Sequence, residues 1–157
     1  MPKLDLSRVP AVTGSDYPEP HATAMGERWF QALGDAAGLT RFGVSRVRLA
    51  PGATSSLRHW HPDEDEFAIV LEGELILVDD AGEQPLRPGD CIGWPAGDEN
   101  GHHILNRSQA DGVFIVVGSR PERDCFYSDV DLVFRNDAAG GRYETRDGTP
   151  VPPREGD

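Results

Sequence analysis

The chain has 157 residues and a formal net charge of −12, with 27 acidic and 15 basic side chains. This length suits a single domain that buries its own core. The acidic excess argues against nucleic acid and anionic membranes as partners, because a polyanion would be repelled. No apolar run approaches the roughly 18 residues of a membrane-spanning helix. Two cysteines, Cys91 and Cys125, occur without a recognisable signal peptide or a dense cysteine framework, so we expect a soluble cytoplasmic protein with free thiols.

The N-terminal part of the sequence has no sustained hydrophobic period. Proline and glycine interrupt residues 1–26 repeatedly, which indicates an extended arm that lies over a neighbouring part or subunit. Residues 27–37 (ERWFQALGDAA) fit one short helix that stops at Gly38, and they fit an irregular loop equally well. We therefore expect residues 1–41 to form an arm followed by a short helix or loop.

From residue 42 onward the pattern is typical of strands. Residues 42–49 (FGVSRVRL) alternate between two faces, and one face carries Arg46 and Arg48. These two arginines either face the interior and pair with a carboxylate substrate or form a stripe on the surface. Further short strands follow, with turn signals about every 8 to 12 residues, which indicates an antiparallel sandwich or barrel.

Several connections in this strand region are predicted from turn residues. Glu72-Gly73 separates two apolar runs, as expected of a hairpin, and residues 79–82 (DDAG) supply the next turn. Residues 111–119 (DGVFIVVGS) form the last strong strand, with a centre that looks buried on both faces. Residues 137–157 are rich in Gly, Pro, Arg and Asp, so we expect a tail that is mobile or docked on another subunit.

The segment HWHPDEDEFAIVLEG carries the candidate site. His59 and His61 are two residues apart, so in a strand both imidazoles point to the same face. A turn at residues 62–64 and an antiparallel return from Glu66 would bring that carboxylate beside the two rings. Two imidazoles and a carboxylate suit a borderline divalent metal with positions left open for water or substrate. We interpret the remaining acids of the run, residues 63–65, as a solvated turn.

The chain resembles a known family over about half of its length. The histidine segment, together with Pro51-Gly52, Gly89-Asp90, Pro95-Ala96-Gly97 and the later His102-x3-Asn106, closely resembles the two conserved motifs of the cupin superfamily. Two spacings depart from the common pattern: six residues instead of five separate Gly52 from His59, and two extra residues lie between Gly97 and His102. A β-bulge would absorb the first extra residue, and a longer loop would absorb the two extra residues of the second.

The resemblance implies the fold and the division of the chain. We expect an all-β protein with a small antiparallel β-barrel of the double-stranded β-helix, or jelly-roll, type. Residues 1–41 would form the arm and short helix or loop, residues 42–136 the cupin barrel, and residues 137–157 the polar C-terminal tail.

The resemblance also implies a metal site. In cupins, two His and one Glu of the first motif and one His of the second motif bind a divalent metal. Carried over residue by residue, this implies His59, His61, Glu66 and His102 as ligands. Only one of two adjacent residues can face the interior of a regular strand, and the spacing of the second motif favours His102 over His103. A nitrogen and oxygen ligand set admits Fe, Mn, Ni, Co or Zn and does not specify which.

Two classes of function fit such a barrel. As an enzyme, the protein would use its metal on a small oxygenated molecule, as a dioxygenase, an isomerase or a lyase. As a binding or sensing module, it would hold a small ligand without turnover. The sequence identifies no catalytic acid or base. It has no tyrosine between Tyr17 and Tyr127, which weighs against the family's best-marked lyases and isomerases.

Three further expectations concern packing and assembly. Trp60 and Trp94 should pack in the wall or the core rather than serve as substrate platforms, and Cys91 should be a small buried residue. We predict a homodimer, because the arm and the strand region after Phe114 leave sheet edges that need cover.

Overall fold

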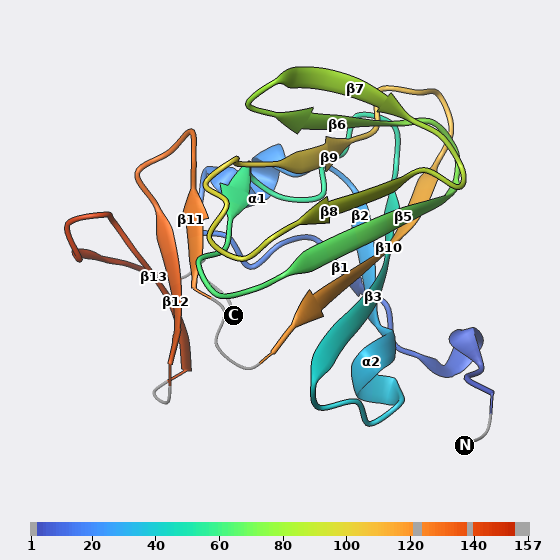
Figure 1. Ribbon diagram of the computed structural model, residues 1–157, viewed down its shortest axis with the longest axis horizontal. Coiled ribbons are helices and arrows are strands. Elements are labelled where there is room, and N and C mark those ends of the chain that lie inside the picture. Colours follow the sequence, from blue (N-terminus) through green and yellow to red (C-terminus); the bar gives the residue numbers. More distant parts are fainter. Residues whose placement is uncertain (1–2, 121–123, 138–139, 153–157) are drawn as a thin grey trace.

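A computed structural model describes residues 3–120, 124–137 and 140–152 of the chain. These residues form mainly short strands, which are arranged in three antiparallel sheets (Figure 1). The all-β antiparallel fold predicted from the sequence is confirmed. The helical parts are single turns: η1 (Leu6–Arg8), α1 (His21–Ala24) and α2 (Leu33–Ala36). Among the described residues, no helix has the length and apolar character needed to cross a membrane.

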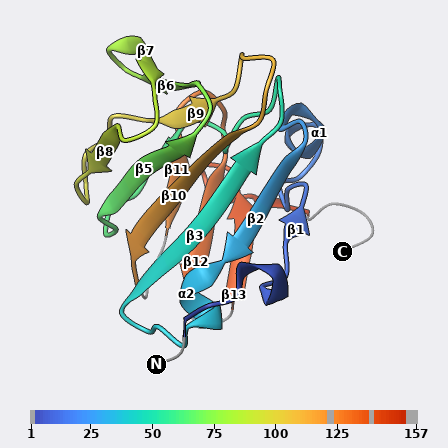
Figure 2. The same ribbon diagram turned by 90° about the vertical axis from the view of Figure 1, so that its right-hand side faces the viewer.

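A six-stranded sheet forms one wall of the molecule (Figure 2). Its strands, in spatial order, are β1 (Val12–Thr13), β2 (Arg28–Ala32), β3 (Phe42–Leu49), β10 (Gly112–Ser119), β5 (Glu66–Glu72) and β8 (Cys91–Trp94). The alternation predicted for β3 is confirmed, since Val47 and Leu49 are buried on the inner face. Phe114 of β10 is buried with them, whereas Ile115, on the opposite face, is only partly buried. The prediction that the centre of β10 is buried on both faces is therefore wrong for its outer face.

The two arginines of β3 lie on the outer face of this sheet. The guanidinium of Arg48 lies 3.6 Å from the ring centroid of Trp29 and 3.3 Å from Asp111. The guanidinium of Arg46 lies 4.0 Å from a carboxylate oxygen of Glu72. Of the two alternatives that the sequence left open, the surface stripe is the one observed.

Two smaller sheets face the first sheet and share one bridge. The three-stranded sheet contains β7 (Gly82–Leu86), β6 (Leu75–Asp79) and β9 (His103–Leu105). The five-stranded sheet contains β14 (Pro150–Val151), β13 (Gly140–Glu144), β12 (Val133–Asp137), β11 (Cys125–Tyr127) and β4 (His59–Trp60). A backbone bridge between His59 and His102 joins the edge of the five-stranded sheet to the segment that leads into β9. The two sheets therefore form one interrupted layer.

The apolar side chains pack in two clusters. The first cluster lies between the six-stranded and three-stranded sheets and is largely aliphatic; it comprises Val47, Leu49, Ala53, Ala68, Val70, Leu75, Leu77, Leu86, Trp94, Ile104 and Phe114. The second cluster joins the N-terminal arm to the five-stranded sheet and is rich in tyrosine; it comprises Tyr17, Ala22, Met25, Cys125, Tyr127, Leu132 and Tyr143. The first cluster comes from consecutive strands, and the second brings both ends of the chain together.

The N-terminal segment differs from the prediction. The helix or loop expected over residues 27–37 is mainly the strand β2, which pairs with β3 from Arg28↔Leu49 to Ala32↔Ser45. Only the single turn α2 is helical, and Gly38 with φ 71° follows it. Pairing along an available strand edge satisfies the backbone of this segment, and such tertiary context overrides a weak helical preference.

The arm before β2 also packs on its own chain. β1 pairs with β2, and Tyr17, Ala22 and Met25 are buried in the second cluster. The arm therefore lies over neighbouring parts of its own chain. The proposed boundaries at residues 41 and 136 stay a prediction.

The C-terminal tail is part of the five-stranded sheet. β13 pairs with β12 and β14 with β13, and Tyr143 is buried. The expectation of a mobile or externally docked tail is therefore wrong for residues 140–152. The expectation for residues 153–157 lies outside the described residues.

One predicted hairpin is a corner between two sheets. β5 and β6, on either side of Gly73, do not pair, because β5 belongs to the six-stranded sheet and β6 to the three-stranded sheet. Gly73 has φ 78°, and a Cβ atom there would lie 2.5 Å from the carbonyl oxygen of Asp111. The corner therefore requires glycine. The turn predicted at residues 79–82 is confirmed, since β6 and β7 pair from Leu75↔Leu86 to Asp79↔Gly82.

Candidate metal centre

The three predicted histidine ligands converge on one carboxylate oxygen of the fourth predicted ligand, Glu66. Glu66 begins β5, His59 begins β4, His61 follows β4, and His102 lies just before β9. The Oε2 atom of Glu66 is 3.0 Å from Nε2 of His102, 3.9 Å from Nε2 of His59 and 4.0 Å from Nε2 of His61. We expected β5 to pair with β4, but β4 pairs with β11 instead. The carboxylate nevertheless lies beside the rings because the two sheets face each other.

The opposite nitrogen of each imidazole is turned toward a backbone carbonyl. The Nδ1 atoms of His59 and His61 lie 2.9 Å from the carbonyl oxygens of Leu57 and Asp124, respectively. The Nδ1 atom of His102 lies 3.4 Å from the carbonyl oxygen two residues before it. A neutral ring that donates Nδ1–H to a carbonyl presents a lone pair at Nε2. Two such lone pairs, on His59 and His61, face the carboxylate of Glu66. The Nε2 atom of His102 lies within hydrogen-bond distance of that carboxylate, and a cation bound by all four groups would replace this proton.

The charge states at this cluster suit metal ligation. Burial lowers the pKa of His59 to about 3, so its ring is neutral near pH 7. Burial alone would raise the pKa of Glu66, but the hydrogen bond with His102 and the neighbouring imidazoles lower it to about 2. Neutral imidazoles and an ionised carboxylate are the forms that bind a divalent ion. The donor set therefore fits a metal.

Aromatic packing fixes part of the cluster. The ring of Trp94 stacks on the ring of His102 with centroids 3.8 Å apart and an interplanar angle of 11°. Trp60 stacks on Phe126 with centroids 4.8 Å apart. Both tryptophans therefore pack in the wall of the molecule, as predicted. Stacking holds His102 in one ring orientation, while His103 turns its Nδ1 atom to the carbonyl of Ser56, 3.0 Å away.

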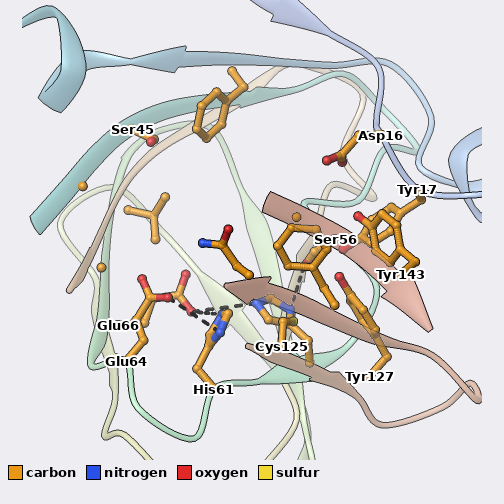
Figure 3. Close-up of a pocket in the computed structure, with 18 of the residues that line it drawn as sticks. Asp16, Tyr17, Ser45, Ser56, His61, Glu64, Glu66, Cys125, Tyr127 and Tyr143 are labelled. Atoms are coloured by element: carbon orange, nitrogen blue, oxygen red, sulfur yellow. Dashed lines mark hydrogen bonds and ion pairs between the residues drawn. The ribbon is translucent and has the colours of Figure 1, made fainter. Parts of the chain in front are cut away.

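A cavity of about 490 Å³ opens in front of this cluster, between the six-stranded and five-stranded sheets (Figure 3). Such a volume is typical of sites for small molecules. Its lining comes from both sheets and from the arm: Asp16, Tyr17, Arg28, Phe30, Gly43, Ser45, Ser56, His59, His61, Glu64, Glu66, Val116, Gly118, Cys125, Tyr127, Phe134, Asn136, Gly141 and Tyr143. Arg46 and Arg48 are not among these residues.

The three tyrosines of the chain meet at this cavity. Tyr17 comes from the arm, Tyr127 from β11 and Tyr143 from β13, with ring centroids 5.4 to 6.5 Å apart. Burial raises the pKa of each of them well above its usual value, so each hydroxyl keeps its proton and can donate a hydrogen bond. From the sequence, we considered only tyrosines near the first motif. Cys125 and Tyr127 are two residues apart and therefore share one face of a strand, and this spacing was the sequence signal that could have placed both at one site.

Glu64 was also misjudged from the sequence. It is buried rather than solvated, and it lies 3.6 Å from Nδ1 of His61. A Cβ atom on Gly118 would lie 1.9 Å from Oε1 of Glu64, so the glycine makes room for this carboxyl group. Asp63 and Asp65 are exposed, as expected.

The two cysteines occupy opposite environments. Both are free, as predicted, but Cys91 is exposed and the expectation of a buried residue was wrong. Cys125 is buried and lies in the cavity wall, and its Sγ atom lies within 4.8 Å of ligand nitrogens of His59 and His61. Burial raises the pKa of Cys125. Sequence reasoning had not placed this thiol at the candidate site.

Comparisons with known proteins agree with this geometry. The family model for the cupin domain matches residues 45–118. A crystal structure from Silicibacter pomeroyi, described as a sugar phosphate isomerase from the cupin superfamily, is 51% identical in sequence. The similarity covers 96% of this chain and 97% of that chain, with a TM-score of 0.92. The chain therefore belongs to the cupin superfamily.

Two other proteins extend the comparison. A structure from Acidithiobacillus ferrooxidans, provisionally named a sugar phosphate isomerase, is 25% identical over 94% of this chain and 92% of that one, with a TM-score of 0.79. The oxalate-binding protein of Thermotoga maritima is 32% identical over 73 residues. That match covers 46% of this chain and 58% of the oxalate-binding protein, so this chain spans little more than half the length of that relative.

Proposed function

We propose that the protein is a metal-dependent enzyme that isomerises a small hydroxylated carbonyl compound. The observation that carries this proposal is the convergence of three imidazole Nε2 atoms on Glu66 at the wall of a cavity that also holds the buried carboxyl group of Glu64. The name of the relative that is 51% identical supports the same class. A dioxygenase or a lyase would use the same ligands, but no second observation favours either.

The ligands in this proposal are His59, His61, Glu66 and His102, and the ion is Fe, Mn, Ni, Co or Zn. When bound, such an ion polarises a substrate carbonyl or hydroxyl oxygen and stabilises negative charge there. The protein holds each ligand in place through a backbone carbonyl or a stacked ring, which supports a defined geometry.

Proton transfer falls to Glu64. Isomerisation of a hydroxy-carbonyl compound removes a proton from the carbon that bears the hydroxyl and returns one to the former carbonyl carbon. A proton also passes between the two oxygens, so no atom is gained or lost. A positioned carboxylate suits the first transfer, and Glu64 is a buried carboxyl group in the cavity wall next to His61. The neighbouring tyrosine hydroxyls would orient the substrate by donating hydrogen bonds.

The test combines elemental analysis with solvent exchange. Protein purified without an affinity tag should contain a divalent metal, and incubation with the right substrate in D2O should place deuterium on the substrate carbon. Glu64→Gln should lower this exchange by about 100-fold with unchanged metal content, whereas Glu66→Gln should lose the metal. Asp63→Asn is the matched control, because Asp63 is exposed and does not line the cavity, and it should change neither.

A binding protein without turnover is the second candidate. The name of the oxalate-binding relative favours it. Tight binding of a small molecule with no exchange and no product would support this class and overturn the isomerase. Oxygen consumption with a redox-active metal would support a dioxygenase instead.

We retain the homodimer and the cytoplasmic location as proposals. The arm covers part of the edge of β2, since β1 pairs with Trp29 and Phe30, and β1 is then the edge strand of the sheet. The outer face of the six-stranded sheet exposes Phe42, Phe67 and Leu71, which are 42%, 45% and 42% accessible, and apolar exposure of this kind favours association. Light scattering at micromolar concentration should give twice the chain mass, and Phe67→Lys should reduce it to the chain mass.

A further inference from the structure

We infer that the cavity selects an uncharged polyhydroxylated molecule, such as a free sugar, over the phosphate ester of the same molecule. This inference rests on the proposed function, because it names the substrate of the same site. Besides the ligand Glu66, it depends on Asp16, Arg28 and the tyrosines, which are not metal ligands in that proposal, and it can therefore fail separately.

Carboxyl groups outnumber cations along the cavity. Asp16, Glu64 and Glu66 line it, and among the described residues of the lining Arg28 contributes the only guanidinium, with no lysine beside it. A phosphate monoester carries close to two negative charges at neutral pH, so proteins commonly bind it with several Arg or Lys side chains. Within the described part of the chain, the cavity lining therefore contains no cluster of cations that would recognise such a group.

The single arginine is already engaged by the protein. Its Nε atom donates a hydrogen bond to the carbonyl oxygen of Gly14 at 2.8 Å, and its Nη1 atom donates to the carbonyl oxygen of Ser55. These contacts tie the arm to the segment before β4. These two bonds use two of the five N–H donors of the guanidinium. Arg28 therefore holds the cavity wall together, and only its remaining N–H groups could contact an anion, as a single cation.

A bound metal does not reverse this balance. A divalent ion and Arg28 supply three positive charges, and the carboxylates of Asp16, Glu64 and Glu66 supply three negative charges when ionised. A neutral substrate leaves this balance unchanged, whereas a phosphate dianion adds two uncompensated charges. Repulsion is stronger in such a partly buried site than in water. The net charge of −12 on the whole chain acts in the same direction.

Among the residues that the structure describes, neither the short helices nor the backbone of Gly118 replaces these cations. A helix N-terminus often binds phosphate, but α1 and α2 have only four residues each. Gly118 lines the cavity, but it pairs in the ladder with Gly43 on one side and Glu66 on the other. Its amide therefore belongs to the sheet.

The groups that are present match sugar hydroxyls. Figure 3 shows Glu64, Glu66 and His61 on one side of the cavity and Asp16, Tyr17 and Tyr143 on the other. Carboxylates accept hydrogen bonds from sugar hydroxyls, and protonated tyrosines donate to them. The tyrosine rings also offer an apolar surface to the C–H faces of a sugar. A molecule with hydroxyl groups along its length would therefore find partners at both ends.

Calorimetric titration can test this selectivity. We would titrate D-xylose, D-ribose, D-glucose and D-fructose, each beside its terminal phosphate ester, into metal-loaded protein and into chelator-treated protein. At least one free sugar should bind at least tenfold more tightly than its ester. Added salt should strengthen binding of the ester and leave the free sugar unchanged, because screening weakens the repulsion. Tighter binding of the esters, or no binding of any free sugar, would overturn the inference.

Single substitutions sharpen the test. Asp16→Asn removes one negative charge at the cavity and should improve the affinity for the ester several-fold, with little change for the free sugar. Asp63→Asn removes an exposed charge outside the cavity and should change neither affinity; an equal gain in both variants would overturn the assignment to the cavity. Loss of metal or of solvent exchange with preserved discrimination would refute the isomerase and leave the selectivity standing.

Discussion

The two buried clusters of the molecule differ in composition and in origin. The first is largely aliphatic, and its members lie between residues 47 and 114. The second contains all three tyrosines and joins residues 17–25 to residues 125–143. The cavity lies where these two parts meet. The motif region therefore contains all four candidate metal ligands, while the two ends of the chain supply the tyrosines and Asp16 of the cavity wall.

The largest expected effect is a difference in metal content between variants of the two adjacent histidines, His102 and His103. His102→Ala should reduce bound metal per chain by more than roughly tenfold, since loss of even an outer-shell partner can cost that much. His103→Ala should leave metal content unchanged, because His103 contacts Ser56 and Thr54 instead. The measurement is metal per chain together with the chelator-induced shift in melting temperature. Full metal in His102→Ala with loss only in His103→Ala would reverse the assignment.

The tyrosine-rich cluster should make the protein sensitive to alkali. Burial raises the pKa of Tyr17, Tyr127 and Tyr143, whereas an unfolded tyrosine ionises near pH 10. Above about pH 10 the unfolded chain therefore binds fewer protons than the folded chain, and stability falls as pH rises. The upper limit is about 1.4 kcal/mol per pH unit for each tyrosine, or about 4 kcal/mol for the three.

Absorbance at 295 nm, followed together with circular dichroism, measures this effect. Tyrosinate absorbance should appear only when the protein unfolds, and in one step. A gradual rise near pH 10 with an unchanged fold would show that the tyrosines are accessible, and the contrast between the two clusters would then be weaker than we describe.

In the aliphatic part, we expect the largest loss of stability from a substitution at the corner between its two sheets. Gly73→Ala combines a positive φ with a Cβ contact of 2.5 Å to the carbonyl of Asp111, and we expect it to lower the free energy of unfolding by about 3 kcal/mol. Gly82→Ala is the matched control, because Gly82 has φ 113° and open space around it, and its cost should be about 1 kcal/mol. Urea denaturation measures both. Equal losses would mean that the close approach contributes nothing.

The smallest effect concerns an ion-pair link between the two parts. Arg58 lies 3.0 Å from Asp80 in the β6–β7 turn and 2.9 Å from Asp129 beyond β11. Arg58→Ala should lower the free energy of unfolding by about 1 kcal/mol. Arg107→Ala breaks an exposed pair with Glu83 and should leave the melting temperature unchanged. If both variants behave alike, the position of Arg58 between the sheets has no energetic importance.

Sequence reasoning was most successful where local pattern and pairing agree. The alternation of β3 and the β6–β7 turn follow from side-chain periodicity and turn chemistry. The place of His102 beside His59, His61 and Glu66 was implied by the family resemblance instead. The strand β2 was missed because the spacing of Trp29, Phe30 and Leu33 also fits one side of a helix, and the segment is organised by pairing with β3. Local periodicity carries no information about such a partner.

The cavity was harder to predict for a related reason. Glu64 sits in a run of acids that normally indicates solvent, and its burial depends on the missing side chain of Gly118, more than fifty positions away in the sequence. Tyr17 and Tyr143 come from segments with few apolar neighbours in sequence, and they become buried only against each other and Tyr127. Contacts between distant segments of this kind leave little trace in composition or period.

The position of the four histidine and glutamate side chains has a consequence for local opening of the fold. Glu66 belongs to the six-stranded sheet, His59 to the five-stranded sheet, and His102 to the segment that enters the three-stranded sheet. An ion held by all of them would cross-link three sheets that otherwise share a single backbone bridge at this point. Amide hydrogen exchange in β4 and β11 should then accelerate when the ion is removed, while exchange in β10 stays slow. A bound metal ion would thus stabilise the wall of the cavity against local unfolding.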